Sequence, residues 1–252
     1  MDKKNMYCQI AGLIYEIEYS YPYVENMYKD YTISKDDIKK SDEIIQISYS
    51  DEEFKNRQDK LVGGYSPGYI EHGCIMAKIA SDLPNHDMLL MHGATIEYDG
   101  KAYIFTAPSG TGKSTHISLW KEYLGDKVKV INGDKPELSF KDGKVFAHGA
   151  PWCGKEGWQI NTSAPLAGVC IVSRGETNEI KRIHPGQNIE VFIKQLYLTD
   201  EPGFMIKVVD LFKKMAEAVP FYEIKCDISE DAAKCSFEAL TKENWDANKI
   251  EK

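Results

Sequence analysis

A glycine-rich segment in the middle of the chain carries residue types that bind phosphate. It has the Walker A spacing from Ala107 to Ser114, with Ala107 in the place of the usual first glycine. Its glycines let several backbone N–H groups point at one anion, and Lys113 adds a positive charge for the β- and γ-phosphates. The Ser114 hydroxyl is placed to ligate Mg²⁺. The sequence therefore predicts a binding site for a nucleoside phosphate, with ATP and Mg²⁺ as cofactors. The residues predicted to bind it are Ser109, Gly110, Thr111, Gly112, Lys113, Ser114 and Thr115.

The secondary structure predicted around this segment fits phosphate binding. Residues 101–106 read as a strand directly before the loop, and residues 114–124 have apolar side chains at helical spacing directly after it. A helix that begins near Lys113 directs the positive end of its dipole at a bound anion. This strand–loop–helix context favours a nucleotide site over a chance glycine-rich turn.

A carboxylate at the end of the next predicted strand is a candidate ligand for Mg²⁺. The apolar strand over residues 128–131 ends in Asn132-Gly133-Asp134. Open α/β sheets bind ligands at the carboxyl ends of their strands, and phosphate loops usually work with a carboxylate there. These residue types also form plain turns. In combination with the phosphate loop, Asp134 is predicted to contact the metal.

Two further polar features have both a functional and a structural interpretation. His92 interrupts an apolar stretch, where a lone histidine is more often a hydrogen-bonded core residue than a functional one. Residues 149–158 combine glycines, two tryptophans and opposite charges, including Lys155 and Glu156. They form either a turn packed by two indoles or a loop that covers a polar site.

Hydrophobic periodicity predicts an α/β protein with a mixed sheet and the phosphate loop at its centre. The turn Asp99-Gly100 makes residues 88–98 and 101–106 antiparallel neighbours, so the sheet cannot be all-parallel. Further strands are predicted over residues 7–19, 44–50, 128–131, 138–140, 144–147, 166–173 and 222–226. Helices are predicted over residues 67–83, 114–124, 188–197, 203–219 and 229–240, the last capped by Ser229.

The same patterns divide the chain into three parts. Residues 1–85 are predicted to form a small β-rich N-terminal region with a linking helix. Residues 86–242 are predicted to form the nucleotide-binding domain. Residues 243–252 are polar and are expected to be a frayed tail.

Composition limits the possible partners and the compartment. The net charge of −8 over 252 residues argues against nucleic acid as the main partner, because its backbone requires a clustered basic surface. The sequence shows no signal peptide and no apolar run long enough for a membrane helix, so no membrane partner and a cytoplasmic location are expected. The six cysteines form no close pair, which fits reduced thiols.

The order of these motifs resembles the kinase domain of the HPr kinase/phosphorylase family, which shares its nucleotide-binding core with phosphoenolpyruvate carboxykinase. The resemblance rests on His92-Gly93, on Ser109 to Thr115 and on Asp134, and it covers about residues 88–160. It implies that Lys113 and the loop bind the β- and γ-phosphates, that Ser114 and Asp134 contact the metal, and that His92 lies beside the transferred phosphate. His92, Lys113 and Asp134 are thus the candidate catalytic residues. Members of the family often assemble, so a homo-oligomer is a possible state.

The chain departs from this family at one position. The first carboxylate of the family's Asp-Asp pair, which acts as the base, falls on Gly133, so Asp134, His92 or Glu156 could replace it. The leading hypothesis is an ATP/Mg-dependent phosphotransferase acting on a hydroxyl of a peptide, protein or small molecule. The alternatives are a nucleotide-binding regulatory or assembly protein with little catalysis, and a simple NTP hydrolase. The acceptor, and the choice of ATP, GTP or pyrophosphate as donor, stay open.

Overall fold

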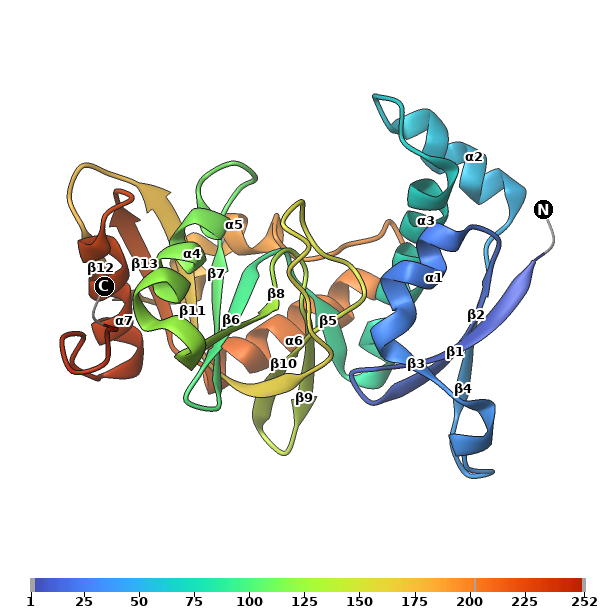
Figure 1. Ribbon diagram of the computed structural model, residues 1–252, viewed down its shortest axis with the longest axis horizontal. Helices are drawn as coiled ribbons and strands as arrows, with labels where there is room; N and C mark the ends of the chain where they lie inside the picture. Colours follow the sequence, from blue (N-terminus) through green and yellow to red (C-terminus); the bar gives the residue numbers. More distant parts are fainter. Residues whose placement is uncertain (1–2, 202, 251–252) are drawn as a thin grey trace. The chain divides into compact units, whose positions relative to one another are not determined.

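A computed structural model describes residues 3–201 and 203–250 of the chain. The chain divides into two compact units, Met1–His86 and Asp87–Lys252, which are described separately (Figure 1).

The first unit is built on a four-stranded sheet with the order β3-β1-β2-β4. Its strands are β1 (Lys4–Ile10), β2 (Leu13–Tyr19), β3 (Thr32–Ile33) and β4 (Ile44–Ile47). The prediction of a single strand over residues 7–19 is wrong. The chain reverses at Ala11 and Gly12, whose φ angles are 49° and 89°, and forms the antiparallel pair β1 and β2. A two-residue turn with both φ angles positive joins antiparallel strands tightly. The strand predicted near residues 44–50 is confirmed as β4, which runs parallel to β2.

Three helices complete this unit: α1 (Pro22–Tyr28), α2 (Asp51–Lys60) and α3 (Pro67–Asp82). The predicted helix over residues 67–83 is confirmed as α3, and the Ser66 side chain accepts a hydrogen bond from the Tyr69 N–H at its start. Helix α2 was not predicted. None of its residues is buried, so it lacks an apolar stripe, and it begins instead with a capping box formed by Ser50 and Glu53.

The second unit contains a mixed sheet, which confirms the predicted sheet type. Its path runs β5-β9-β10-β11-β7-β6-β8, and β13 pairs with β11 and β12. Strands β7, β11 and β13 are parallel, and the other pairs are antiparallel. The strands are β5 (Met88–Leu90), β6 (Ala94–Tyr98), β7 (Lys101–Thr106), β8 (Val128–Asn132), β9 (Glu137–Lys141), β10 (Lys144–His148), β11 (Ser163–Arg174), β12 (Glu179–Ile183) and β13 (Phe221–Cys226).

One expected strand is in fact two. The stretch over residues 88–98 breaks at His92, so that β5 pairs with β9 while β6 pairs with β7 and β8. At the break the N–H groups of His92 and Gly93 donate to the carbonyls of Gln195 (2.6 Å) and Asp134 (2.8 Å) instead of to a ladder partner. A Cβ added at Gly93 would lie 2.7 Å from the Ile104 side chain, so glycine permits this close approach.

Four helices pack on the sheet: α4 (Lys113–Leu124), α5 (Ile189–Ile193), α6 (Phe204–Ala218) and α7 (Glu230–Thr241). One core contains side chains of α4 and α7, including Trp120 and Phe237, and a second core contains side chains of α5 and α6, including Phe212. Helix α5 is shorter than predicted. Ser229 stands at the start of α7, but its hydroxyl donates to Asp227 (2.5 Å) rather than capping the helix.

The C-terminal segment is packed rather than frayed. The expectation of a frayed polar tail is wrong for residues 243–250, because Trp245 is fully buried against Phe237 and Tyr123. Asn248 also accepts a hydrogen bond from Tyr98 (3.1 Å). A single buried indole outweighs the polar residues around it, which composition alone does not reveal.

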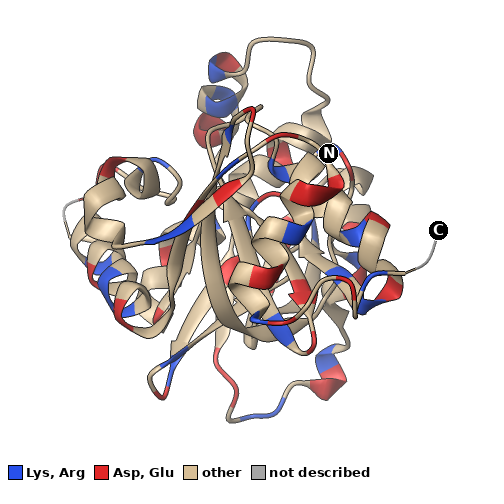
Figure 2. Cartoon of the chain, turned by 90° about the vertical axis from the view of Figure 1, so that its left-hand side faces the viewer, with Lys and Arg blue, Asp and Glu red and all other residues tan. Residues whose placement is uncertain are grey.

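Charged side chains are spread over the described elements. Figure 2 shows Lys and Arg interspersed with Asp and Glu along the helices and strands. Within residues 3–201 and 203–250, no helix has both the length and the apolar character needed to cross a bilayer.

Candidate active site

Several chain segments meet at one edge of the second unit's sheet. Strands β7, β11 and β13 are parallel, and β8 has the direction of β7 because both are antiparallel to β6. Their carboxyl ends therefore lie at the same edge, where open sheets bind ligands. The glycine-rich loop follows β7, Asp134 follows β8, and His92 stands just before β6 at this edge.

The glycine-rich loop reverses direction at its two glycines. Gly110 and Gly112 have φ angles of 77° and 126°, and a Cβ on either would meet nothing within 4 Å. Glycine is therefore required here by the backbone angle and not by lack of space. Ala107 replaces the usual first glycine without strain, since it does not have a positive φ. Its buried carbonyl accepts a hydrogen bond from Lys113 Nζ at 2.9 Å.

Helix α4 begins directly after the loop. Gly112 occupies its N-cap position and provides no side-chain cap for the first N–H groups of the helix. The positive end of the helix dipole lies at this terminus and faces the loop. Lys113 is the first helical residue and is only 8% exposed. Burial lowers the pKa of Lys113, and the charge of Asp134 counteracts that change. A buried cation near a helix N-terminus suits an anionic ligand.

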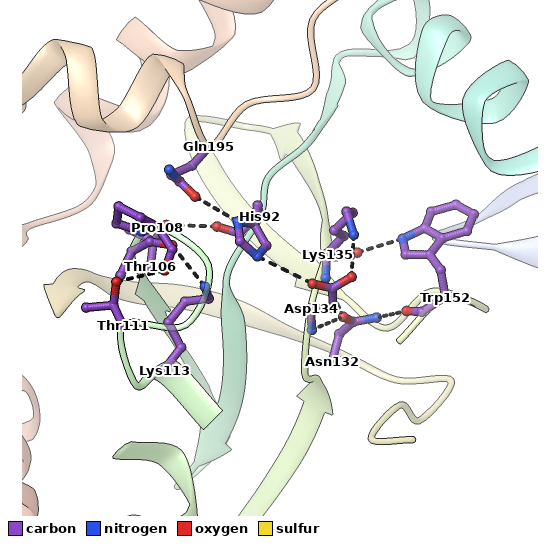
Figure 3. Close-up of polar contacts among 11 residues, drawn as sticks. His92, Thr106, Pro108, Thr111, Lys113, Asn132, Asp134, Lys135, Trp152 and Gln195 are labelled. Carbon is purple, nitrogen blue, oxygen red and sulfur yellow. Dashed lines mark hydrogen bonds and ion pairs between the residues drawn. The ribbon is translucent and has the colours of Figure 1, made fainter. Parts of the chain in front are cut away.

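His92 and Asp134 form the polar pair beside this loop. Figure 3 shows their side chains pointing toward each other, with Nε2 of His92 3.4 Å from Oδ1 of Asp134. Lys135 Nζ contacts the other carboxylate oxygen. Burial alone would raise the pKa of Asp134, but the hydrogen bond from His92 and the charge of Lys135 outweigh it and lower this pKa to about 2. Asp134 is therefore ionised at neutral pH.

Three hydrogen bonds fix the position of His92. Its N–H donates to the Gln195 carbonyl (2.6 Å), and its carbonyl accepts from the Thr106 hydroxyl (2.8 Å). Its Nδ1 lies 2.7 Å from Oε1 of Gln195. Since an amide oxygen only accepts, Nδ1 carries the proton in the neutral ring, and Nε2 donates a hydrogen bond to Asp134 only when the ring is protonated.

Asn132 organises the turn that carries Asp134. Its side-chain Oδ1 accepts hydrogen bonds from the N–H groups of Asp134 (2.9 Å) and Lys135 (2.7 Å). Its Nδ2 donates to the Trp152 carbonyl at 2.8 Å, and Trp152 Nε1 donates to the Lys135 carbonyl at 2.7 Å. Residues 149–158 therefore lie against this turn, and Trp152 is a buried part of the packing.

Gly133 lies close to Trp158 in the turn that carries Asp134. The Gly133 N–H donates to the Trp158 carbonyl at 2.9 Å, and a Cβ on Gly133 would lie 3.3 Å from Cβ of Trp158. Glu156 lies nearby: a Cβ on Gly154 would be 2.9 Å from its Oε2 and 3.7 Å from Cβ of Asp134. The loop thus brings one exposed carboxylate to the side of Asp134.

Most residues singled out in the sequence meet at this edge, and several partners were not predicted. The predicted residues are the loop from Ser109 to Thr115, Asp134 and His92. Gln195 and Lys135 were not predicted, nor was Arg174, whose guanidinium donates to the carbonyls of Gly110 (2.6 Å) and Thr111 (3.2 Å). The turn formed by Asn132 was visible in the sequence, but its contact with Trp152 was not.

Comparisons with known proteins give one family match. The model of the family described as ScmC, SynChlorMet cassette protein ScmC, matches residues 70–231, which is more than half of the chain. No curated protein matches the chain. Among solved structures, the Hpr(Ser) kinase/phosphatase from Coxiella burnetii is similar at 9% identity and a TM-score of 0.34, over 61% of this chain and 93% of that one. A similarity of this size does not establish a shared fold or function.

Proposed function

The chain belongs to the ScmC family of SynChlorMet cassette proteins, and we propose that it is an ATP- and Mg²⁺-dependent phosphotransferase that acts on a hydroxyl group. One observation carries the proposal. A glycine-rich loop with a buried lysine shares one sheet edge with an ionised Asp134 that contacts His92. Phosphoryl transfer depends on positioning and charge stabilisation, which such an arrangement supplies.

The residues present fit a nucleotide that carries its own Mg²⁺. In the proposal Lys113 and the loop N–H groups bind the phosphates, and Ser114 and Asp134 hold the metal. One carboxylate and one hydroxyl suffice, since Mg²⁺ usually completes its octahedron with phosphate oxygens and water. Bound Mg²⁺ would neutralise charge that develops on the phosphate oxygens.

His92 is the better candidate for the general base. The acceptor hydroxyl must lose its proton as its oxygen bonds to phosphorus and ADP leaves. The pKa of Asp134 is about 2, so its carboxylate is a weak base at neutral pH. His92 would take the proton on Nε2, while Gln195 holds Nδ1 and Asp134 stabilises the resulting imidazolium.

A nucleotide-binding regulatory protein is the second candidate. Gly133, which packs against Trp158 and brings no carboxylate, favours it. A simple NTP hydrolase would use the same groups on water. The two enzymatic functions differ in whether formation of ADP needs a hydroxyl acceptor other than water.

Calorimetric titration with ATP and ADP in the presence of Mg²⁺ tests the phosphate site. We expect micromolar binding by the wild type, loss of binding in Lys113→Ala and no change in Lys121→Ala, an exposed lysine on the same helix. Retained binding in Lys113→Ala would contradict the proposal. Binding of ATP without hydrolysis, and without transfer of its terminal phosphoryl group to any hydroxyl acceptor, would leave the regulatory function as the better account.

A further inference from the structure

A cavity of about 280 Å³ opens beside the glycine-rich loop. On one side it is lined by Thr111, Gly112 and Thr115, from the loop and the first turn of α4. On the other side it is lined by residues at the ends of two strands, including Arg174, the last residue of β11, and Asp227, which follows β13. The proposed chemistry uses none of the strand-end residues.

The sheet order places this cavity on the opposite side of the loop from Asp134. Strand β7, which leads into the loop, has β6 and then β8 on one side, and β11 and then β13 on the other. Asp134 follows β8, whereas Arg174 and Asp227 lie at β11 and β13. A phosphate chain bound across the loop would therefore have one end at Asp134 and the other at the cavity.

The inner wall of the cavity is apolar and uncharged. Leu119, Val172 and Cys226 line it and are nearly buried. His116 also lines it, and burial lowers the pKa of this histidine to about 4, so the ring is neutral. Ser236 Oγ lies 2.8 Å from its Nε2. Flat aromatic rings bind in such surroundings, whereas phosphate does not.

The rim supplies a few polar groups and one exposed apolar side chain. Ile228 is 76% exposed and offers a surface on which a ring can stack. Asp227 Oδ1 accepts hydrogen bonds from the N–H (2.9 Å) and the hydroxyl (2.5 Å) of Ser229, and a carboxylate in this position suits the hydroxyl or amino groups of a ligand. The Arg174 guanidinium, which holds the loop carbonyls of Gly110 and Thr111, connects this rim with the phosphate loop.

We propose that this cavity holds the nucleoside half of the phosphate donor, so that the donor is a nucleoside triphosphate and not pyrophosphate or another inorganic polyphosphate. The inference rests on the proposed function, because it extends the same bound ligand beyond its phosphates. One nucleotide would then occupy both sides of the loop, with its nucleobase in the cavity and its terminal phosphoryl group beside Asp134.

Calorimetry with ATP, GTP and inorganic tripolyphosphate, each with Mg²⁺, tests the inference on the full chain. We expect the wild type to bind ATP or GTP at least about tenfold more tightly than tripolyphosphate, which has the same phosphate chain without a nucleoside. Leu119→Trp, which fills the cavity, should abolish this preference and leave tripolyphosphate binding unchanged. Ile228→Asp, at an exposed position that should not affect folding, should reduce the preference. Ile206→Asp, at an exposed site on α6, is the matched control.

The outcomes separate the two proposals. Equal affinity for tripolyphosphate and nucleotides in the wild type would overturn the nucleoside cavity and leave the phosphate site intact. Equal weakening of all three ligands by Ile228→Asp would overturn it as well. Failure of the wild type to bind any of the three would overturn the proposed function, and the nucleoside cavity with it.

Discussion

Asp134 is held by three different kinds of contact. His92 and Lys135 approach its carboxylate, and Asn132 accepts a hydrogen bond from its backbone N–H. The backbone bond depends on the turn, whereas the other two depend on the negative charge. Replacement by asparagine therefore removes the charge and keeps the turn.

We predict that Asp134→Asn reduces Mg²⁺-dependent turnover of ATP on the order of a hundredfold and raises the Mg²⁺ concentration needed for half-maximal rate. Asp142→Asn is the matched control, since Asp142 lies in the exposed β9–β10 turn. Initial rates against Mg²⁺ concentration measure both effects. An unchanged Mg²⁺ dependence in Asp134→Asn would exclude a metal-binding role.

Glu137 is a buried acid outside the proposed chemistry. Its side chain is fully buried, and neither carboxyl oxygen has a hydrogen-bond partner among residues 3–201 and 203–250. Burial raises the pKa of Glu137 to about 8. His148, opposite it in the β9–β10 register, has a pKa lowered to about 4 by burial and brings no positive charge above that pH.

The raised pKa of Glu137 predicts a pH-dependent stability. A carboxyl whose pKa is raised in the folded state favours folding fully below pH 4.5, and this contribution is lost as pH rises through 8. Glu137→Gln cannot ionise, so its free energy of unfolding should match the wild type near pH 4.5 and exceed it increasingly toward pH 8. Between these pH values the difference in the free energy of unfolding should grow by about 1.4 kcal/mol per pH unit. Urea denaturation across this pH range measures it, and parallel profiles would show that Glu137 is not buried as a neutral acid.

At the scale of elements, local sequence signals account for the hairpins β6–β7 and β9–β10 and for helices α3, α4, α6 and α7. The turns Asp99-Gly100 and Asp142-Gly143 have positive φ angles at both residues, as their residue types predict. The turn at Ala11 has the same geometry but was missed, because alanine seldom adopts a positive φ. Strand β12 was missed for a different reason, since its exposed, charged residues carry no apolar alternation.

The candidate site could be predicted only where one segment supplies the chemistry. The loop and Asp134 each follow a recognisable strand, so spacing identified them. Gln195 and Arg174 could not be found in this way, because 103 residues separate Gln195 from His92 and 64 separate Arg174 from Gly110. Such contacts depend on the strand order of the sheet, which local patterns do not determine.

The loop conformation leads to a prediction at this scale. Gly112 has a φ of 126°, outside the region open to other residues, so Gly112→Ala should cost about 1–3 kcal/mol locally. We expect ATP affinity to fall about tenfold or more. Gly143→Ala, which also replaces a glycine with positive φ, should leave ATP affinity unchanged. Equal affinities for the wild type and Gly112→Ala would mean that the loop backbone does not bind the phosphates.

At the scale of the second unit, the two ends of α4 serve different purposes. Its first turn belongs to the proposed phosphate site, whereas Tyr123 near its last turn packs on Trp245. A helix of 12 residues is about 18 Å long, so these contacts are well separated. Trp245 Nε1 donates to Glu230 (2.9 Å), and Ile250 N–H donates to the Tyr123 carbonyl (2.8 Å). The C-terminal segment therefore supports the fold at a distance from the site.

This separation predicts that stability and ligand binding respond to different substitutions. Trp245→Ala should lower the free energy of unfolding by about 3–5 kcal/mol, because it empties a fully buried indole site. Saturating ATP and Mg²⁺ should still raise the melting temperature of this variant by nearly as much as that of the wild type, since a ligand stabilises whatever folded state binds it. Lys113→Ala should show the opposite pattern, with little change in stability and no rise in melting temperature on adding ATP. Thermal denaturation with and without ATP measures both, and loss of the ATP-induced rise in Trp245→Ala would show that the far end of α4 controls the phosphate site after all.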